Sequence, residues 1–413
     1  MNVKIIDKKG SYILPSESIM LIQHISENML IQKLILMFKS FSFTIKFLCA
    51  IFISLFILSQ AAHAANNLEP MTSAECLQDI NFTANFLLEN DAGIKGKSWV
   101  TYPKNIQTIL DTQKKETIKV KNIKNCEDII KPFLKAIRKG HIGLDNKSIA
   151  SFFQKSSISQ QDDFVTTKKL SDLTSYIFIP SFEPSIKFQL DKIIDNNQDN
   201  ILNARYLILD VRKNSGGQDD SAEILFRLLG EAEYWIEMPK IYTSDANIQT
   251  YKNLEKIISD IKTKEYLAEI IKRMEHKKND WVYVQGDTSL VSEKIDKIDV
   301  LANPIKVVVL TDEDSASSGE EFIKSVKQNP KVVTIGRNTY GALDASNLRE
   351  VQTPSKKLYL SYATTYVHRH TGQEIDNIGI PPHILLPKPV DQQAYENEIK
   401  FSQDYLEKEK WKH

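Results

Sequence analysis

The chain has 413 residues, of which 42% are hydrophobic and 26% are charged, and this composition is typical of a globular protein with one large core or two modest ones. Its 53 Lys and Arg residues balance 53 Asp and Glu residues, so the formal net charge is +0. A balanced charge gives no overall field that would attract nucleic acid or an anionic membrane surface, and neither partner is predicted.

The N-terminal part of the chain has the pattern of an export signal. Lys39 and Lys46 precede an apolar run over residues 47–58, and small residues dominate 59–65. A basic region, a short apolar core and a small-x-small site are typical of a secretory signal, here cleaved after Ala64. A membrane anchor is the alternative, but the run is short for crossing hydrocarbon and no charges follow it. We expect an exported protein, periplasmic or secreted, that meets the membrane only during export.

The signal begins unusually deep in the chain. Met37 stands where an ordinary signal would start, so residues 1–36 are interpreted as an upstream extension from a misplaced start. A long natural leader is the alternative. Residues 1–64 together are therefore treated as extension plus signal and are left out of the predicted fold.

The chain contains three cysteines, and their positions bear on lipid attachment, disulfide formation and metal binding. Cys49 lies in the apolar run and lacks the small-residue context of a lipid attachment site, so no lipid anchor is predicted. Cys76 and Cys126 remain, and in an exported protein a disulfide is the natural interpretation, with two free buried thiols as the alternative. Neither belongs to a metal-type cluster, and no metal or cofactor is predicted.

Residues 65–140 are predicted to form a small helical region. Residues 73–77 open like a capped helix, and apolar spacing over 126–138 predicts another helix. Gly140 is predicted to end that helix, which places His141 at a helix-to-strand corner. A surface histidine at a helix end is the simpler interpretation of His141 when nothing else is considered.

Strands alternate with helices over residues 170–390, and this alternation predicts an α/β sheet core within residues 141–395. Residues 231–299 are predicted to be a Lys-rich helical insertion in that core, with a short strand over 281–284, and to act as a lid or substrate-guiding arm or to be a solvated elaboration. Residues 396–413 are treated as a C-terminal tail. The predicted strands cover 176–182, 206–211, 305–310, 331–336 and 357–367, and the predicted helices include 222–229, 254–274 and 320–326.

A strand-to-helix turn over residues 312–322 is rich in small side chains. Such a turn lifts a hydroxyl out of the sheet edge and aims the first free amides of the helix at an oxyanion. The simpler interpretation is a capped helix start, with Ser315 or Ser317 as N-cap and Glu320 completing a capping box. A double glycine, Gly216-Gly217, follows another buried strand and allows backbone amides to approach a ligand, or simply makes a tight turn.

Four motifs occur in one order along the chain, and each is weak alone. Together they resemble the core of the tail-specific, or C-terminal processing, serine peptidases over about residues 135–390. The resemblance implies a ClpP/crotonase-type α/β sheet core and hydrolysis of peptide bonds by a serine nucleophile. The motifs are Asp-Val-Arg-Lys-Asn-Ser-Gly-Gly at 210–217, Ser-Ala-Ser-Ser-Gly-Glu at 315–320, Gly336-x-x-Thr339-x-Gly341 and Gly379-Ile380-x-Pro382.

The resemblance assigns roles to residues that match the family's motifs. The nucleophile falls on Ser317, and the oxyanion donors fall on the Ser318 amide and an amide of Gly216 or Gly217. In the branch of the family with a serine–lysine dyad, the base lysine directly follows the second glycine of the Gly-x-x-Thr-x-Gly turn. Here that residue is Ala342, which excludes a dyad of that form.

The other branch is similar to the tricorn core and the retinoid-binding interstitial proteins. Its members carry a Gly-His motif and an acid shortly before the Gly-Ile-x-Pro element. Gly140-His141 matches the first, and Asp376 matches the second, where the family more often has glutamate. The resemblance therefore implies a Ser317, His141 and Asp376 arrangement. His383 stands where the family usually has aspartate, and it is given no role.

Two histidines compete with His141 as the base. His368 and His370 lie in a turn-like stretch after a strand, so they are ranked below His141 and expected to be exposed. The segment between residues 141 and 176 is too short for the PDZ module that many tail-specific peptidases carry. Recognition of a substrate tail by such a module is therefore not expected.

The sequence favours an exported serine peptidase that acts on proteins or peptides through an acyl-enzyme. The alternative is a non-catalytic protein that uses the same fold to bind a peptide or an apolar ligand. Retention of the serine, the histidine, the acid and the double glycine together favours the enzyme.

Overall fold

The computed structural model describes residues 69–148, 164–196, 198–201, 203–230, 232–295 and 304–408. The chain divides into Met1–Glu69 and Pro70–His413, and the fold below is that of the second unit. The predicted export signal, its cleavage site after Ala64 and the proposed start at Met37 lie outside the described residues. Within the described ranges, every helix is too short or too polar to cross a membrane.

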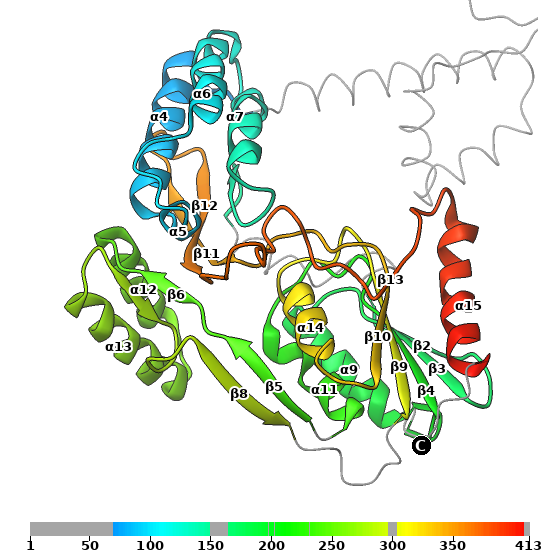
Figure 1. The fold of residues 1–413 in the computed structure, drawn as a ribbon. Helices are drawn as coiled ribbons and strands as arrows, with labels where there is room; N and C mark the ends of the chain where they lie inside the picture. The colour runs from blue at the N-terminus through cyan, green and yellow to red at the C-terminus, as the bar shows by residue number, and fades with distance from the viewer. Residues whose placement is uncertain are drawn as a thin grey trace, which may run out of the picture. The chain divides into compact units, whose positions relative to one another are not determined.

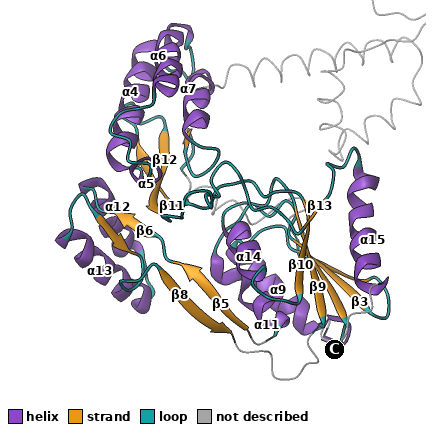
Figure 2. Cartoon of the chain, viewed as in Figure 1, coloured by secondary structure: helices purple, strands orange, loops and turns teal. Residues whose placement is uncertain are grey.

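The central sheet of the α/β part of the chain is parallel except for one antiparallel edge strand (Figures 1 and 2). Its order is β13-β10-β9-β4-β3-β2, and only β2 runs antiparallel to its neighbour. Because β4, β9 and β10 are adjacent and parallel, the loops that follow them leave the same edge of the sheet. The strands are β2 (Thr166–Lys169), β3 (Thr174–Phe178), β4 (Tyr206–Asp210), β9 (Lys306–Thr311), β10 (Val332–Gly336) and β13 (Ile384–Leu385).

Helices cover both faces of this sheet, which explains why its inner strands β4 and β9 are buried apolar runs. One face packs against α9, α11 and α14, with Phe182 and Phe322 in the shared core. The other face packs against α15, whose Leu406 is fully buried beside strand residues. The helices are α9 (Pro184–Asn196), α10 (Gln198–Ile201), η3 (Asp219–Ala222), α11 (Glu223–Leu229), α14 (Ser318–Val326) and α15 (Gln392–Lys408).

A second sheet, with the order β1-β12-β6-β7 and β11 paired to β12, joins distant parts of the chain. It packs against the N-terminal helices, where Leu358, Leu360 and Tyr362 share one core with helix residues. The elements are α4 (Ser73–Asn90), α5 (Ala92–Gly96), α6 (Lys104–Glu116), η1 (Thr117–Lys119), α7 (Ile123–Ile137), β1 (Gly143–Asp145), β6 (Lys240–Tyr242), β7 (Trp281–Tyr283), β11 (Ala345–Gln352) and β12 (Tyr359–Tyr366).

The α/β class is confirmed, and several predicted elements differ in detail. The strand predicted at 281–284 in the segment 231–299 is present as β7 (Trp281–Tyr283), and the segment also supplies β6 to the second sheet and forms a two-stranded ribbon that was not predicted. The predicted helix 254–274 is two helices, separated near Asp260, which caps the second one. The elements are β5 (Ala232–Glu237), α12 (Asp245–Ile257), α13 (Ile261–His276) and β8 (Leu290–Ile295).

Two further differences concern the ends of predicted segments. Helix α7 ends at Ile137, so Gly140 is not its terminating glycine; Arg138, whose side chain is buried, follows the helix with an extended backbone at φ −166°. The C-terminal residues 396–413 are not a loose tail as far as they are described, because α15 extends to Lys408 and packs on the sheet. The predicted domain limits themselves stay predictions.

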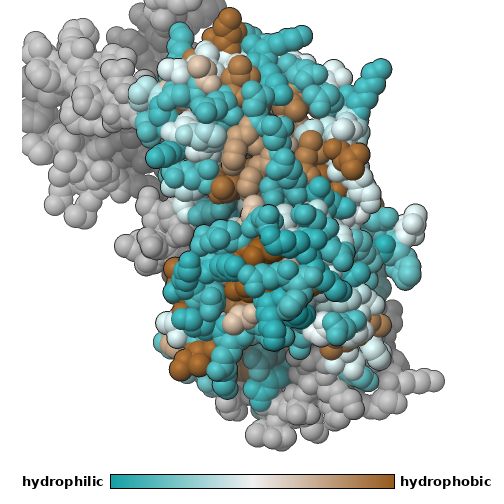
Figure 3. Space-filling view, turned by 90° about the vertical axis from the view of Figure 1, so that its left-hand side faces the viewer, coloured by the Kyte–Doolittle hydropathy of each residue, from teal (hydrophilic) through white to brown (hydrophobic). Residues whose placement is uncertain are grey.

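The structure joins Cys76 and Cys126 in a disulfide with 5.7 Å between the Cα atoms. The bond connects α4 to α7, and both cysteines are fully buried in the helical core. On the face of the molecule in Figure 3, hydrophobic side chains lie in small groups separated by hydrophilic ones.

Candidate active site

The predicted nucleophile Ser317 lies in a sharp turn between β9 and α14. Its backbone has φ 54° and ψ −123°, a conformation that residues other than glycine adopt only at a cost of about 1 to 3 kcal/mol. Ser315 stabilises the turn, since its buried Oγ donates to the Val211 carbonyl at 2.9 Å. The turn leaves Ser317 partly exposed and makes it the residue directly before the helix begins.

Glu320, in the first turn of α14, holds the serine turn from inside. Its fully buried carboxylate accepts the Ser317 N–H at 3.1 Å, as a capping-box glutamate does. The same carboxylate accepts the N–H groups of Gly341 at 2.8 Å and Ala342 at 2.7 Å. It also accepts the Thr339 hydroxyl at 2.5 Å. Burial raises the pKa of Glu320, and these donors oppose that rise.

His141 lies beside Ser317, although 176 residues separate them in the chain. Its Nε2 is 3.0 Å from Ser317 Oγ. Its Nδ1 is 2.6 Å from the Ala345 carbonyl oxygen, which only accepts hydrogen bonds, so Nδ1 carries the proton. This tautomer leaves the Nε2 lone pair facing the serine hydroxyl. Burial lowers the pKa of His141 to about 4, so the imidazole is neutral and able to accept a proton at pH 7.

A buried ion pair holds the backbone of His141, which has φ 54°. Arg138 donates from Nη1 and Nη2 to the two oxygens of Asp91, each at 2.6 Å. The same guanidinium donates to the carbonyls of Gly140 at 2.9 Å and of His141 at 2.6 Å. Asp91 also accepts the Ala363 N–H at 3.0 Å. Arg138 therefore anchors the left-handed turn at His141 to α5 and β12.

The predicted contact between Asp376 and His141 is not formed. Among the described residues, the Asp376 carboxylate accepts only backbone N–H groups, those of Leu343 and Asp344 at 2.8 Å and of Ala345 at 3.2 Å. The Ala345 carbonyl occupies the position at Nδ1 that a carboxylate would need. Asp376 therefore supports the imidazole indirectly, because it holds residues 343–345 and the Ala345 carbonyl orients the imidazole. Burial raises the pKa of Asp376, and the neighbouring Asp344 raises it further.

The predicted oxyanion donors divide into two groups. The N–H groups of Gly217 and Ser318 have no hydrogen-bond partner within the described part of the chain. The two loops lie close together, since a Cβ on Gly216 would be 3.0 Å from Ser318 N. The sequence left open which glycine of the pair donates, and the Gly216 N–H is already engaged because it donates to Asn214 Oδ1 at 3.0 Å. Gly217 and Ser318 therefore remain as the available donors next to Ser317.

Asn214 was not singled out from the sequence, and it joins the two loops of the site. Its carbonyl accepts the Ala316 N–H at 2.9 Å, and its fully buried side chain donates to the Ile179 carbonyl at 3.2 Å. Gly319 lies so close to the Asn214 carbonyl that a Cβ on Gly319 would be 2.7 Å from the carbonyl oxygen. The signal that could have identified Asn214 is its place in the Asp-Val-Arg-Lys-Asn-Ser-Gly-Gly loop.

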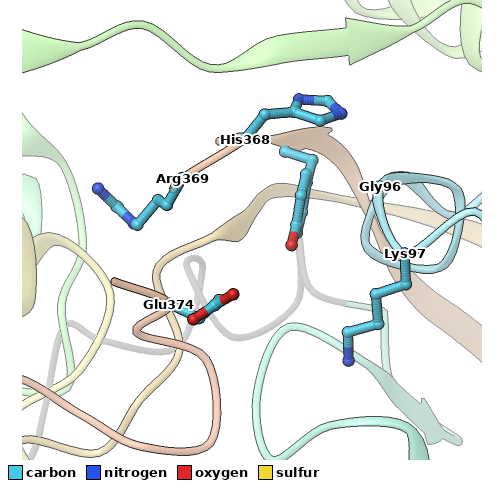
Figure 4. Close-up of a pocket in the computed structure, with 6 residues that line it drawn as sticks. Gly96, Lys97, His368, Arg369 and Glu374 are labelled. Atoms are coloured by element: carbon cyan, nitrogen blue, oxygen red, sulfur yellow. The ribbon is translucent and has the colours of Figure 1, made fainter. Parts of the chain in front are cut away.

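The other histidines lie away from the serine. His368 and His370 are exposed, and His368 packs edge-on against Trp281 with 4.7 Å between ring centroids. His383 has a structural contact, since its Nδ1 accepts the Thr334 N–H at 3.0 Å. A hollow of about 410 Å³ near the end of α5 has His368 among its lining residues and none of the predicted catalytic residues (Figure 4). Its lining residues are Gly96, Lys97, Tyr366, His368, Arg369 and Glu374.

A family comparison shows which family the chain belongs to. The model of peptidase family S41 matches residues 174–386, which is more than half of the chain and includes the serine turn and the double-glycine loop. The chain belongs to peptidase family S41, and it is a serine-type peptidase whose substrates are proteins or peptides. A comparison with curated proteins finds no match.

Two solved structures of CPAF have a similar fold. Mature CPAF is 12% identical with a TM-score of 0.54, over 81% of this chain and 96% of that chain. CPAF complexed with lactacystin is 13% identical with a TM-score of 0.52, over 81% and 97% of the two chains. The photosystem II D1 C-terminal processing protease is 15% identical with a TM-score of 0.31, over 60% and 48%. At these identities the likeness to CPAF shows the fold alone.

Proposed function

We propose that this peptidase cleaves peptide bonds through Ser317 as nucleophile and His141 as general base. The observation that carries the proposal is the 3.0 Å contact between His141 Nε2 and Ser317 Oγ, made by an imidazole whose tautomer is fixed by the Ala345 carbonyl. The depressed pKa of His141 keeps this base unprotonated at neutral pH. No lysine stands at the dyad position, where Ala342 is buried.

The reaction proceeds through an acyl-enzyme. His141 takes the proton from Ser317 Oγ as this oxygen attacks the scissile carbonyl. The developing oxyanion accepts hydrogen bonds from the N–H groups of Ser318 and Gly217. Each such donor contributes about 3 to 4 kcal/mol in comparable sites. The imidazolium then protonates the leaving amine, and water, activated by the same histidine, hydrolyses the ester.

Asp376 supports this reaction without touching the imidazole. Its carboxylate holds three consecutive N–H groups, so the Ala345 carbonyl stays in place to accept the Nδ1 proton. Burial lowers the pKa of His141, and the hydrogen bond to the Ala345 carbonyl opposes this fall less than a full negative charge would.

We also propose that the peptidase acts after export, in the periplasm or outside the cell. The signal-like pattern before Ala65 supports this proposal, as does the disulfide between Cys76 and Cys126.

Labelling with a fluorophosphonate tests the proposed nucleophile and base. The chain that begins at Ala65 is expected to be labelled, whereas Ser317→Ala and His141→Ala are expected to lose labelling. His370→Ala changes an exposed histidine and serves as the matched control, which is expected to react like the wild type. A folded wild type that does not react would favour the non-catalytic alternative, a binding protein on the same fold.

A further inference from the structure

A buried carboxylate on the C-terminal helix lies between two arginines. Glu398 of α15 is 6% exposed. Its Oε2 accepts Arg212 Nη1 at 2.8 Å, and its Oε1 accepts Arg337 Nη1 at 2.5 Å. Removing this one charge would leave two guanidinium groups facing each other in a space with little water.

Each arginine belongs to a loop that leaves the carboxyl edge of the central sheet. Arg212 lies two residues beyond β4. Its Nε and Nη2 donate to the Asp210 carboxylate at 2.8 Å and 2.5 Å. Arg337 directly follows β10, and its Nε donates at 3.0 Å to Glu313, which follows β9. Glu398 therefore connects the ends of three neighbouring strands through two arginines.

Those three loops carry the proposed catalytic groups. The loop after β4 contains Asn214 and the Gly217 donor, and the loop after β9 contains Ser317. The loop after β10 contains the turn that donates to Glu320, and it ends at Ala345, whose carbonyl orients His141. A shift of one loop relative to the others would change the distance between the serine and its oxyanion donors.

Helix α15 is well placed to act as a fixed support. It packs on the sheet face opposite α14 (Figure 1), and Tyr395, one turn before Glu398, stacks on the guanidinium of Arg212 at 3.6 Å from the ring centroid. The Tyr395 carbonyl accepts a further hydrogen bond from Arg212 at 2.8 Å. Arg212 is thus held by the helix through a charge, a ring and a carbonyl.

We propose that Glu398 is a positioning residue of the hydrolytic site, which fixes the loops after β4, β9 and β10 relative to one another. This inference rests on the proposed function for its kinetic consequences, and it gives α15 a part in activity. Glu398 is buried and acts on the loops through Arg212 and Arg337, so its loss is expected to change the rate of reaction and leave substrate binding largely intact.

Kinetics of Glu398→Gln test this role in the full chain. We expect kcat per active site, counted by fluorophosphonate titration, to fall about 10- to 100-fold with little change in KM, because the reacting groups are misplaced. The preference for an ester over the matched thionoester should also fall, because weakened oxyanion donors distinguish oxygen from sulfur less well. Glu396→Gln, on the exposed side of the same helix, is the control and should match the wild type.

Hydrogen exchange supplies a readout that requires no activity. Glu398→Gln should speed amide exchange in residues 211–217 and 337–345 while β4 and β9 stay protected, and this outcome would support the positioning role even if Ser317 were not the nucleophile. If Glu398→Gln does not fold, Arg337→Met removes one arm of the contact and should show the same loop and kcat changes. A folded variant of either kind with wild-type kcat, ester preference and loop exchange would overturn the inference.

Discussion

The Nδ1 of His141 donates to the Ala345 carbonyl at 2.6 Å, so a backbone group occupies the position at which a carboxylate supports the imidazole of a Ser-His-Asp arrangement. A neutral acceptor fixes the tautomer as a carboxylate does, but it adds no full charge next to the ring. The proposed base is therefore oriented by the backbone and kept weakly basic by burial.

This relationship predicts a small effect for Asp376→Asn. In a triad with direct contact, the corresponding change lowers kcat by about 10⁴ because the wrong tautomer is stabilised. Here the Nδ1–H tautomer does not depend on Asp376, so we expect kcat/KM to fall only about 10-fold. This fall corresponds to a rise of about 1.4 kcal/mol in the activation free energy, caused by weaker support of residues 343–345. A fall near 10⁴ would mean that the carboxylate contacts the imidazole during the reaction.

The low pKa of His141 predicts the acid limb of the pH profile. Protonation of Nε2 removes the base, so kcat/KM should fall as pH drops through about 4, whereas an ordinary histidine would cause this fall near 6.5. The folded pKa is depressed, so His141 also makes the protein less stable as pH falls from about 6.5 to about 4, because the unfolded chain binds the proton first. An acid limb near 6.5 would contradict the buried, neutral imidazole.

The ion pair between Asp91 and Arg138 predicts a large loss of stability for Asp91→Asn. The change leaves a fully buried arginine without its charge partner, which costs about 3 to 5 kcal/mol in the free energy of unfolding. Activity should fall as well, because Arg138 also holds the carbonyls of Gly140 and His141.

Asp128→Asn is the matched control, since Asp128 makes exposed pairs with Lys124 and Lys131. Its effect should stay within about 0.5 kcal/mol. Urea unfolding of the three proteins measures both values, and equal midpoints for Asp91→Asn and Asp128→Asn would show that the buried pair does not support the fold.

The disulfide predicts a dependence of stability on redox conditions. Cys76 and Cys126 are 50 residues apart in sequence, and closing a loop of that length stabilises the folded state by about 4 kcal/mol in the chain-entropy account. Reduction, or the double change to serine, should lower the free energy of unfolding by an amount of this order. Two thiols that titrate in the unreduced, unfolded protein would show that the bond does not form.

The sequence predicted those features of the site that depend on local patterns. The strands before the Ser317 turn and the Gly216-Gly217 loop are buried apolar runs, and the small residues after them signal sharp turns. The resemblance that these motifs carry in their order implied that Ser317 and His141 share one site, and the structure brings these two residues together.

The remaining features depend on contacts between distant residues, which a single sequence does not reveal. Nothing near Asp376 indicates that its carboxylate accepts N–H groups of residues 343–345 and leaves His141 to a carbonyl. Gly216 could not be separated from Gly217 until the side chain of Asn214 was placed. Glu398 belonged to a polar stretch without a motif, and only its position between Arg212 and Arg337 indicates a role.

Trapping of the acyl-enzyme tests the central claim most directly. The protein is mixed with an activated ester, quenched in acid and digested, and the acylated peptide is identified by mass spectrometry. The account predicts one acyl group per chain, on the peptide that contains Ser317, with none on Ser317→Ala and slow formation on His141→Ala. Hydrolysis that proceeds without an acyl group on Ser317, or with the acyl group on another serine such as Ser318, would contradict it.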